Sequence, residues 1–215
     1  MNLKTIQQKL DEGRQYRRID VTNLEIRTAE DGAKIVTGYA TTFNDPYELY
    51  SFDGYTVVEQ VDARAFDETD MSDVIMQYDH EGRVFARTSN NTLSIKPDSR
   101  GLFIEANLGG TELGRQLYEE IRGGYTNKMS FGFRVSEDKR EVTEDRENGK
   151  TTVLRTITKI SKLYDVSAVS IPANDATSIS ARNYGEGVIA EIKQELLDLE
   201  KRVRQKNKIK ILLEM

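Results

Sequence analysis

The sequence contains no cysteine, which excludes disulfide bonds, thiolate zinc sites and a cysteine nucleophile, and is compatible with a reducing compartment. No apolar run reaches the length of a transmembrane helix. The first 18 residues also lack the apolar core of a signal peptide. These absences predict a soluble, cytosolic protein without a membrane partner.

Only one histidine is present, His80, and this count restricts the available chemistry more than any other. A mechanism that needs a side chain titrating near neutral pH therefore has one default candidate. Catalytic zinc usually requires several histidines or a cysteine, and the sequence shows no EF-hand spacing, P-loop or dinucleotide glycine motif. We predict no cofactor, while carboxylate-only Mg²⁺ or Ca²⁺ sites and a two-carboxylate glycosidase remain open alternatives.

Acidic residues outnumber basic ones, 36 to 31, which gives a net charge of −5. Binding to nucleic acid through phosphate contacts is disfavoured, because such proteins are expected to be basic. The 215 residues are 37% hydrophobic and 31% charged, which fits one domain with appendages or at most two small domains. We therefore predict a rather polar chain with one main core and no nucleic-acid partner.

Short alternating runs predict many β-strands, and two segments predict helices. The strands are expected at residues 24–27, 34–43, 55–61, 74–78, 92–96, 102–108, 127–135, 151–160 and 163–171. The first two runs flank Asp31-Gly32 and predict a hairpin. A helix is expected from Thr111, its N-cap, with Leu113, Leu117 and Ile121 as the apolar face. The charged residues 136–150 predict a solvated loop or a hairpin tip.

The pattern as a whole predicts a β-rich α+β domain, closed or nearly closed. Residues 1–19 are expected to form a flexible N-terminal arm or a short docking helix, and residues 20–183 the domain. Residues 184–215 are expected to form an amphipathic helix and tail that can be removed without loss of the fold. The apolar stripe of this helix has near-heptad spacing and is compatible with a coiled coil.

Ser130 is the first candidate for chemistry. In the run 127–135, Phe131, Phe133 and Val135 alternate with Ser130 and Gly132, so a strand would turn the serine away from the aromatic pair. Gly132 would let another backbone or a substrate approach closely. A reactive hydroxyl could be displayed in this way, and an ordinary strand serine would give the same pattern.

His80 and Asp165 are the residues that could activate such a serine. Serine needs a base to accept its proton, and the base needs a partner that fixes its tautomer. His80 follows the apolar run 74–78, where it is either a presented base or a surface turn residue. Asp165 interrupts the apolar run 163–171, where a carboxylate is either buried and paired or at a solvent-facing strand edge.

Several short motifs occur in an order and at spacings typical of a known family. They are residues 38–43 (GYATTF), Glu59 with 64–66 (RAF), 79–81 (DHE), 100–102 (RGL), 129–133 (MSFGF), 164–167 (YDVS), 171–174 (IPAN) and Arg182. The family usually has glycine at the position of Arg64 and glutamate at that of Asp165. Residues 22–183 resemble the prohead (procapsid maturation) proteases of HK97-like tailed bacteriophages.

The resemblance implies a β-barrel ringed by helices, similar to the herpesvirus assembly proteases. It also implies a serine endopeptidase with Ser130 as nucleophile, His80 as base and Asp165 as the third member. The implied substrates are the scaffolding part of the major capsid protein or a separate scaffold protein, and the protease itself. Self-association and contact with the portal are implied as well, in the host cytoplasm inside the immature capsid.

A second hypothesis is a non-enzymatic assembly or scaffolding protein with an inactive protease-like fold. The polar N-terminal segment and the helix expected at 186–206 would suit docking to capsid subunits. A small internal scaffold would be mostly helical, whereas the protease would be mostly β. The balance of helix and strand therefore discriminates between the two hypotheses.

Overall fold

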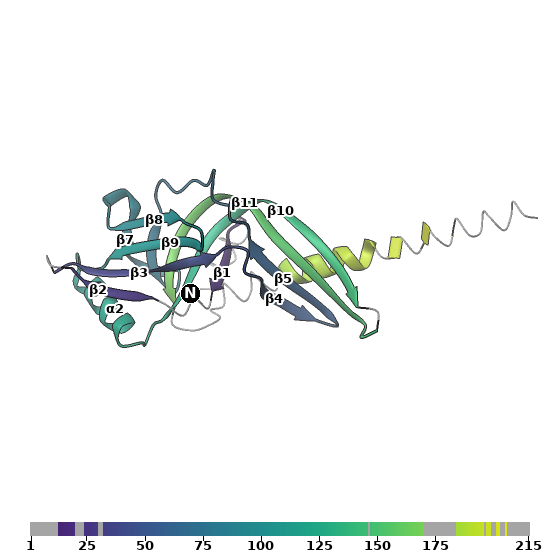
Figure 1. Cartoon of the computed structure of the whole chain (residues 1–215), viewed down its shortest axis with the longest axis horizontal. Coiled ribbons are helices and arrows are strands. Elements are labelled where there is room, and N and C mark those ends of the chain that lie inside the picture. Colours follow the sequence, from purple (N-terminus) through teal and green to yellow (C-terminus); the bar gives the residue numbers. More distant parts are fainter. Residues whose placement is uncertain are drawn as a thin grey trace, which may run out of the picture.

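The computed structural model describes residues 13–19, 24–29, 32–145, 147–169 and 184–195, with 197, 198, 201, 202 and 205. Its strands form two sheets (Figure 1). The larger sheet has seven strands, with β1, β10, β11, β5 and β4 in order and β6 and β7 joined through β11. The smaller sheet has the order β2-β3-β9-β8.

The elements have the following bounds. The strands are β1 (Gln15–Ile19), β2 (Glu25–Thr28), β3 (Lys34–Thr42), β4 (Tyr47–Phe52), β5 (Tyr55–Val61), β6 (Ile75–Tyr78), β7 (Glu81–Arg87), β8 (Leu93–Pro97), β9 (Gly101–Asn107), β10 (Lys128–Asp145) and β11 (Lys150–Val169). The helices with full bounds are the short 3-10 helix η1 (Thr88–Asn90) and α2 (Glu112–Arg122).

A long antiparallel hairpin, β10–β11, organises the larger sheet. Figure 1 shows it arching from the side of the smaller sheet to a tip beside β4 and β5. One edge of β11 pairs in parallel with β5 near the tip and with β6 near the base. The charged run 136–150, expected to be a loop or a hairpin tip, extends the two strands instead, and only its end turns. The two strands expected at 151–160 and 163–171 are one continuous strand as far as Val169.

The smaller sheet and α2 follow the sequence prediction closely. β2 and β3 form the expected hairpin. Thr111 caps α2, because its Oγ1 accepts a hydrogen bond of 2.9 Å from the Gly114 amide. The buried face of the helix differs from the prediction, since Leu117, Tyr118 and Ile121 are buried while Leu113 is 37% exposed. A single apolar core joins this sheet, α2 and the base of β10–β11.

The N-terminal residues contradict the expected flexible arm as far as they are described. Residues 15–19 form β1, which pairs antiparallel with β10 over its whole length. Tyr16 and Arg17 are 0% and 1% exposed. A polar segment is therefore an integral edge strand of the larger sheet, and the buried arginine has ionic partners described below.

The helical residues 184–195 are part of the packed structure. Val188, Ile189 and Ile192 form a second apolar cluster with Val57 of β5 and Val153 of β11. Figure 1 shows this helix running along β5 near the tip of the long hairpin. The expected boundary at 183/184 therefore does not mark the end of the packed part of the chain. The expected motif 171–174, Arg182 and most of the tail beyond 198 lie outside the described residues.

The β-rich α+β class is confirmed. The strand pairing among the described residues forms two separate sheets and does not close into a barrel, as the resemblance implied it would. The likeness to the herpesvirus assembly proteases therefore stays a prediction. Within the described part of the chain, no helix is long and apolar enough to cross a membrane.

Candidate active site

The base of the long hairpin places Ser130 and Asp165 on the same face of the sheet. Ser130 pairs with Ser167, and Gly132 pairs with Asp165, across the two antiparallel strands. Directly opposed residues share a face, and residues two apart on one strand do so as well. Phe131 and Phe133 stack on the other face, with ring centroids 4.3 Å apart. The alternation predicted from the sequence is therefore present.

His80 lies in the two-residue turn that joins β6 to β7. Tyr78 pairs with Glu81 across this turn, and both Asp79 and His80 have positive φ angles of 50° and 58°. Such angles match the tight turns that connect hairpin strands, but they are unfavourable for residues with a Cβ. The Asp79 amide donates a hydrogen bond of 2.9 Å to the Ala168 carbonyl of β11, which anchors the turn beside Asp165.

Ser130, His80 and Asp165 form one continuous series of contacts, named here the serine–histidine–aspartate group. His80 Nε2 lies 2.5 Å from Ser130 Oγ, and His80 Nδ1 lies 2.5 Å from Asp165 Oδ1. All three side chains are at most 3% exposed. An ionised carboxylate only accepts hydrogen bonds, so the imidazole proton belongs on Nδ1, and Nε2 is left to accept the serine proton. This is the arrangement that general-base activation of a serine requires.

The environment of Asp165 keeps its carboxylate ionised. Burial opposes ionisation, but the electrostatic interaction with His80, the hydrogen bond from its Nδ1 and the hydrogen bond from Ser167 hold the pKa of Asp165 below its usual value. Ser167 Oγ donates to Asp165 Oδ1 over 2.8 Å. An aspartate, although shorter than the family's usual glutamate, thus reaches the imidazole directly. Asp165 can orient His80 and stabilise the imidazolium that forms when the serine is deprotonated.

Gly132 provides the space that the Asp165 carboxylate occupies. A Cβ built on Gly132 would lie 2.3 Å from Asp165 Oδ2 and 2.9 Å from Tyr16 Cε1. Any side chain at this position would displace the carboxylate or the tyrosine ring. The sequence indicated a close approach at this glycine, and the approaching group is the carboxylate itself.

β1 covers the serine–histidine–aspartate group. The Arg17 carbonyl oxygen lies 2.9 Å from Ser130 Oγ, and the Tyr16 ring meets the His80 ring edge-on at 4.6 Å. The serine has a single O–H, which it donates either to His80 Nε2 or to the Arg17 carbonyl. Ser130 is 1% exposed, so a backbone segment of this chain already occupies the space beside the hydroxyl.

A second set of charges, the arginine–glutamate cluster, consists of the buried Arg17, Glu59 and Arg155 with the half-buried Asp138. Arg17 donates to Glu59 Oε1 through Nε and to Oε2 through Nη2, the latter over 3.0 Å. Arg155 donates to Glu59 Oε2 and to Asp138 Oδ2, each over 2.6 Å. Burial opposes ionisation of Glu59, but the two guanidinium groups and the Tyr47 hydroxyl lower its pKa to about 2.

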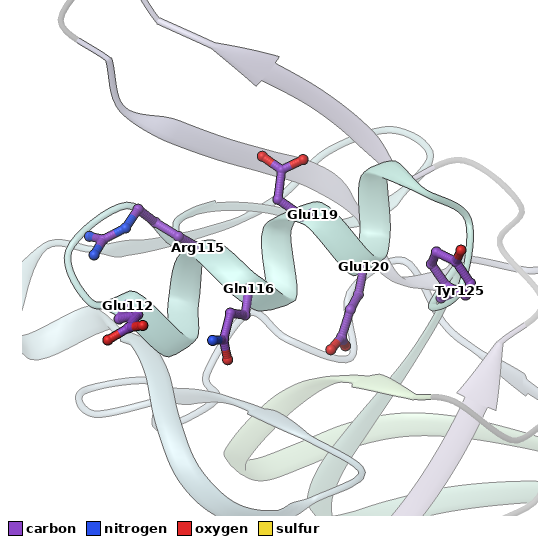
Figure 2. Close-up of a pocket in the computed structure, with 6 residues that line it drawn as sticks. All are labelled: Glu112, Arg115, Gln116, Glu119, Glu120 and Tyr125. Atoms are coloured by element: carbon purple, nitrogen blue, oxygen red, sulfur yellow. The ribbon is translucent and has the colours of Figure 1, made fainter.

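A hollow of about 510 Å³ lies elsewhere, against the outer face of α2. Figure 2 shows the residues that line it: Glu112, Arg115, Gln116, Glu119, Glu120 and Tyr125. All six side chains are exposed, and none belongs to the serine–histidine–aspartate group or the arginine–glutamate cluster. The hollow is a solvated surface depression without buried polar groups that would define a site.

Sequence reasoning identified Ser130, His80 and Asp165, which the structure brings together, but it missed Ser167, Tyr16 and Arg17. Ser167 could have been found, because it lies two residues after Asp165 on one strand and so shares its face. No local signal marks Tyr16 and Arg17, since their burial depends on partners far along the chain. Among the described residues, no cluster of histidine and acidic side chains suits a metal ion.

Comparisons with known proteins complete the description of the site. No curated protein sequence matches the chain. Among solved structures, the bacteriophage T4 capsid assembly protease is similar at 12% identity and a TM-score of 0.40, over 73% of this chain and 98% of that one. The family model described as caudovirus prohead serine protease matches residues 22–189, which is most of the chain and begins after β1. The chain therefore belongs to the caudovirus prohead serine protease family.

Proposed function

We propose that the protein is a serine endopeptidase that cleaves a scaffold protein, or the scaffolding segment of the major capsid protein, inside the immature capsid. The observation that carries this is the unbroken contact from Ser130 Oγ through both nitrogens of His80 to Asp165. The portal and further copies of the protease are the other partners that we propose, and the protease itself is a further substrate.

In the proposed mechanism, Ser130 Oγ attacks the carbonyl carbon of the scissile peptide bond while His80 Nε2 accepts the hydroxyl proton. Collapse of the tetrahedral intermediate breaks the C–N bond, and His80 returns the proton to the departing amine. An ester between Ser130 and the acyl fragment remains. Water then gives a proton to His80 while its oxygen attacks the ester carbonyl carbon. When the bond from that carbon to Ser130 Oγ breaks, His80 returns the proton to Oγ, which releases the carboxylic acid and restores Ser130.

Asp165 supports both steps without transferring a proton itself. It holds His80 with Nε2 toward the serine and stabilises the imidazolium by its negative charge. Ser167 fixes the carboxylate, and the lowered pKa of Asp165 keeps it ionised near neutral pH. The short positive-φ turn limits the positions that His80 can adopt.

The decisive experiment is co-expression of the protease with the major capsid protein and any separate scaffold protein encoded beside it. Ser130→Ala is expected to abolish cleavage, with a loss of at least about 10⁴-fold, because the remaining groups provide no nucleophile. The masses of both proteins are measured by intact mass spectrometry. Ser136→Ala is the matched control, since Ser136 is an exposed serine on the same strand.

Two outcomes would contradict the proposal. Normal processing by the Ser130→Ala protein would remove Ser130 from the mechanism and favour the scaffolding hypothesis. Normal processing by His80→Ala would do the same for the base, because no second histidine can replace it. The prevalence of strands among the described residues supports the protease over a mostly helical scaffold.

A further inference from the structure

β1 lies along β10 as a bound peptide strand would. It is antiparallel to β10, with Arg18 opposite Ser130 and Arg17 opposite Phe131. Building on the proposed endopeptidase function, we propose that the substrate binds as an extended strand in the place of β1. We further propose that the buried site at Glu59 now filled by the Arg17 side chain, named here the Glu59 pocket, selects an arginine at the residue that precedes the cleaved bond.

The position of the Arg17 carbonyl identifies which residue of the strand precedes the cut. A serine nucleophile attacks the carbonyl of the residue on the N-terminal side of the scissile bond, so that carbonyl must lie beside its hydroxyl. The Arg17 carbonyl oxygen is 2.9 Å from Ser130 Oγ. The side chain of Arg17 therefore marks the subsite for the residue before the cut, and the Arg17–Arg18 bond takes the place of the scissile bond.

The subsite built around Arg17 is specific for a planar cation. Two different nitrogens of the guanidinium, Nε and Nη2, reach the two oxygens of Glu59. The guanidinium carbon lies 5.8 Å from the centroid of the Phe133 ring. A two-pronged contact with a carboxylate matches arginine better than lysine, whose ammonium is a single point charge.

Charge balance predicts what the pocket accepts when β1 leaves. With Arg17 in place, two carboxylates, Glu59 and Asp138, face two guanidinium groups. Without it, Arg155 is the one guanidinium of the cluster left to oppose both carboxylates, so the cluster carries a net negative charge around the fully buried Glu59. Such a site attracts a cationic side chain and excludes an acidic one. With Arg17 in place, the pKa of Glu59 is lowered to about 2, so the carboxylate that holds the arginine is ionised in the bound state.

The backbone of β10 supplies the rest of the binding energy. An edge strand presents a row of N–H and C=O groups, which an extended peptide of any sequence can pair with. Strand pairing thus fixes the register of the substrate, and the Glu59 pocket adds selectivity at one residue. The fully buried state of Ser130 and His80 requires that β1 leave the cleft before another chain enters.

The test uses the full-length protein and two synthetic peptides that copy residues 11–24 of the chain. The second peptide carries citrulline at the position of Arg17, which keeps the shape of arginine but removes its charge. Both are added at millimolar concentration, and cut products are identified by mass spectrometry. We expect a cut after Arg17, with kcat/KM at least about 30-fold lower for citrulline, because a buried carboxylate loses its charged partner.

Each other outcome has a definite meaning. Equal rates for the two peptides, or cuts at another bond, would overturn the inference and leave the endopeptidase function standing. The inference would also be overturned, with the endopeptidase function still standing, if a preparation that processes the capsid protein did not cut the arginine peptide. If neither the peptides nor the capsid protein is cut, the proposed function fails together with the inference. A Glu59→Gln variant could unfold, and for that reason the peptides carry the change.

Discussion

The two faces of the β10–β11 hairpin each bury polar side chains, but they do so in different ways. On one face, hydrogen bonds join Ser130 and His80 to one ionised carboxylate, that of Asp165. On the other face, Arg17 and Arg155 neutralise Glu59 and Asp138. The first group is complete without β1, whereas the second loses its charge balance when β1 leaves. Under the two proposals above, the reaction takes place on one face of the hairpin, and substrate recognition depends on the other.

The largest expected effect on stability is that of Glu59→Gln. Removing this charge leaves two buried guanidinium groups without their shared partner, which costs about 3–5 kcal/mol of the free energy of unfolding. Urea denaturation measures the change. Ser130→Ala, on the opposite face, is expected to change this free energy by less than about 1 kcal/mol. If both variants lost a comparable free energy of unfolding, the two faces would not differ in their contribution to stability.

The dependence of stability on pH also distinguishes the arginine–glutamate cluster from the opposite face. The pKa of Glu59 is lowered from 4.5 to about 2 in the folded protein, so the unfolded chain binds the proton more readily. Its contribution to stability is complete above pH 4.5 and is lost as the pH falls toward 2. Glu59→Gln should therefore flatten the pH dependence of unfolding in this window. Glu105→Gln, in an exposed pair with Arg27, is the control and should leave the curve unchanged.

A smaller effect is expected for Gly132→Ala, which disturbs the reactive face alone. The new Cβ would overlap Asp165 Oδ2, and the displaced carboxylate would turn His80 away from Ser130. We expect kcat to fall about 100-fold with little change in KM, since the cluster that we propose to bind the substrate is on the other face. Steady-state kinetics measures this. Gly110→Ala, where a Cβ meets nothing within 4 Å, is the control, and equal rates for the two variants would contradict the prediction.

The smallest effect is expected for Tyr184→Ala, on the face of the arginine–glutamate cluster. The Tyr184 ring covers the Arg155 guanidinium at 3.9 Å, and its hydroxyl accepts a hydrogen bond of 3.1 Å from Arg140. Its loss should lower the free energy of unfolding by about 1–2 kcal/mol, as measured by urea denaturation. Ending the chain after residue 198 is the control, because the described contacts with the sheet come from residues 184–193. If the truncation lowered the free energy of unfolding more than Tyr184→Ala does, residues beyond 198 would contribute more to stability than Tyr184, and the prediction would be wrong.

The sequence predicted those parts of the fold whose signals are local. The hairpin of β2 and β3 and the cap of α2 follow from alternation and from Thr111. The outer half of β10 was not predicted as a strand, because residues 136–145 are mostly charged and exposed and carry no apolar alternation. Leu113 was placed on the wrong side because the buried stripe follows Leu117, Tyr118 and Ile121 instead.

The candidate site divides in the same way. Ser130, His80 and Asp165 could be singled out, because one histidine and one carboxylate in an apolar run leave few choices. The role of β1 could not be predicted. Gln-Tyr-Arg-Arg-Ile looks like a solvated segment, and Arg17 is buried only because Glu59, 42 residues away, supplies the opposite charge. Long-range charge pairing leaves no periodicity in a sequence.

The pairing of β1 with β10 has a consequence for when the enzyme acts. A strand tethered to its own cleft competes at an effective concentration in the millimolar range, however dilute the protein is. A substrate segment that diffuses freely at micromolar concentration would rarely displace it. Substrate segments packed together inside a closed capsid reach millimolar local concentrations, like that of the tethered β1, and can compete with β1 for the site. The density of the assembled substrate, rather than the amount of enzyme, would then set the onset of cleavage.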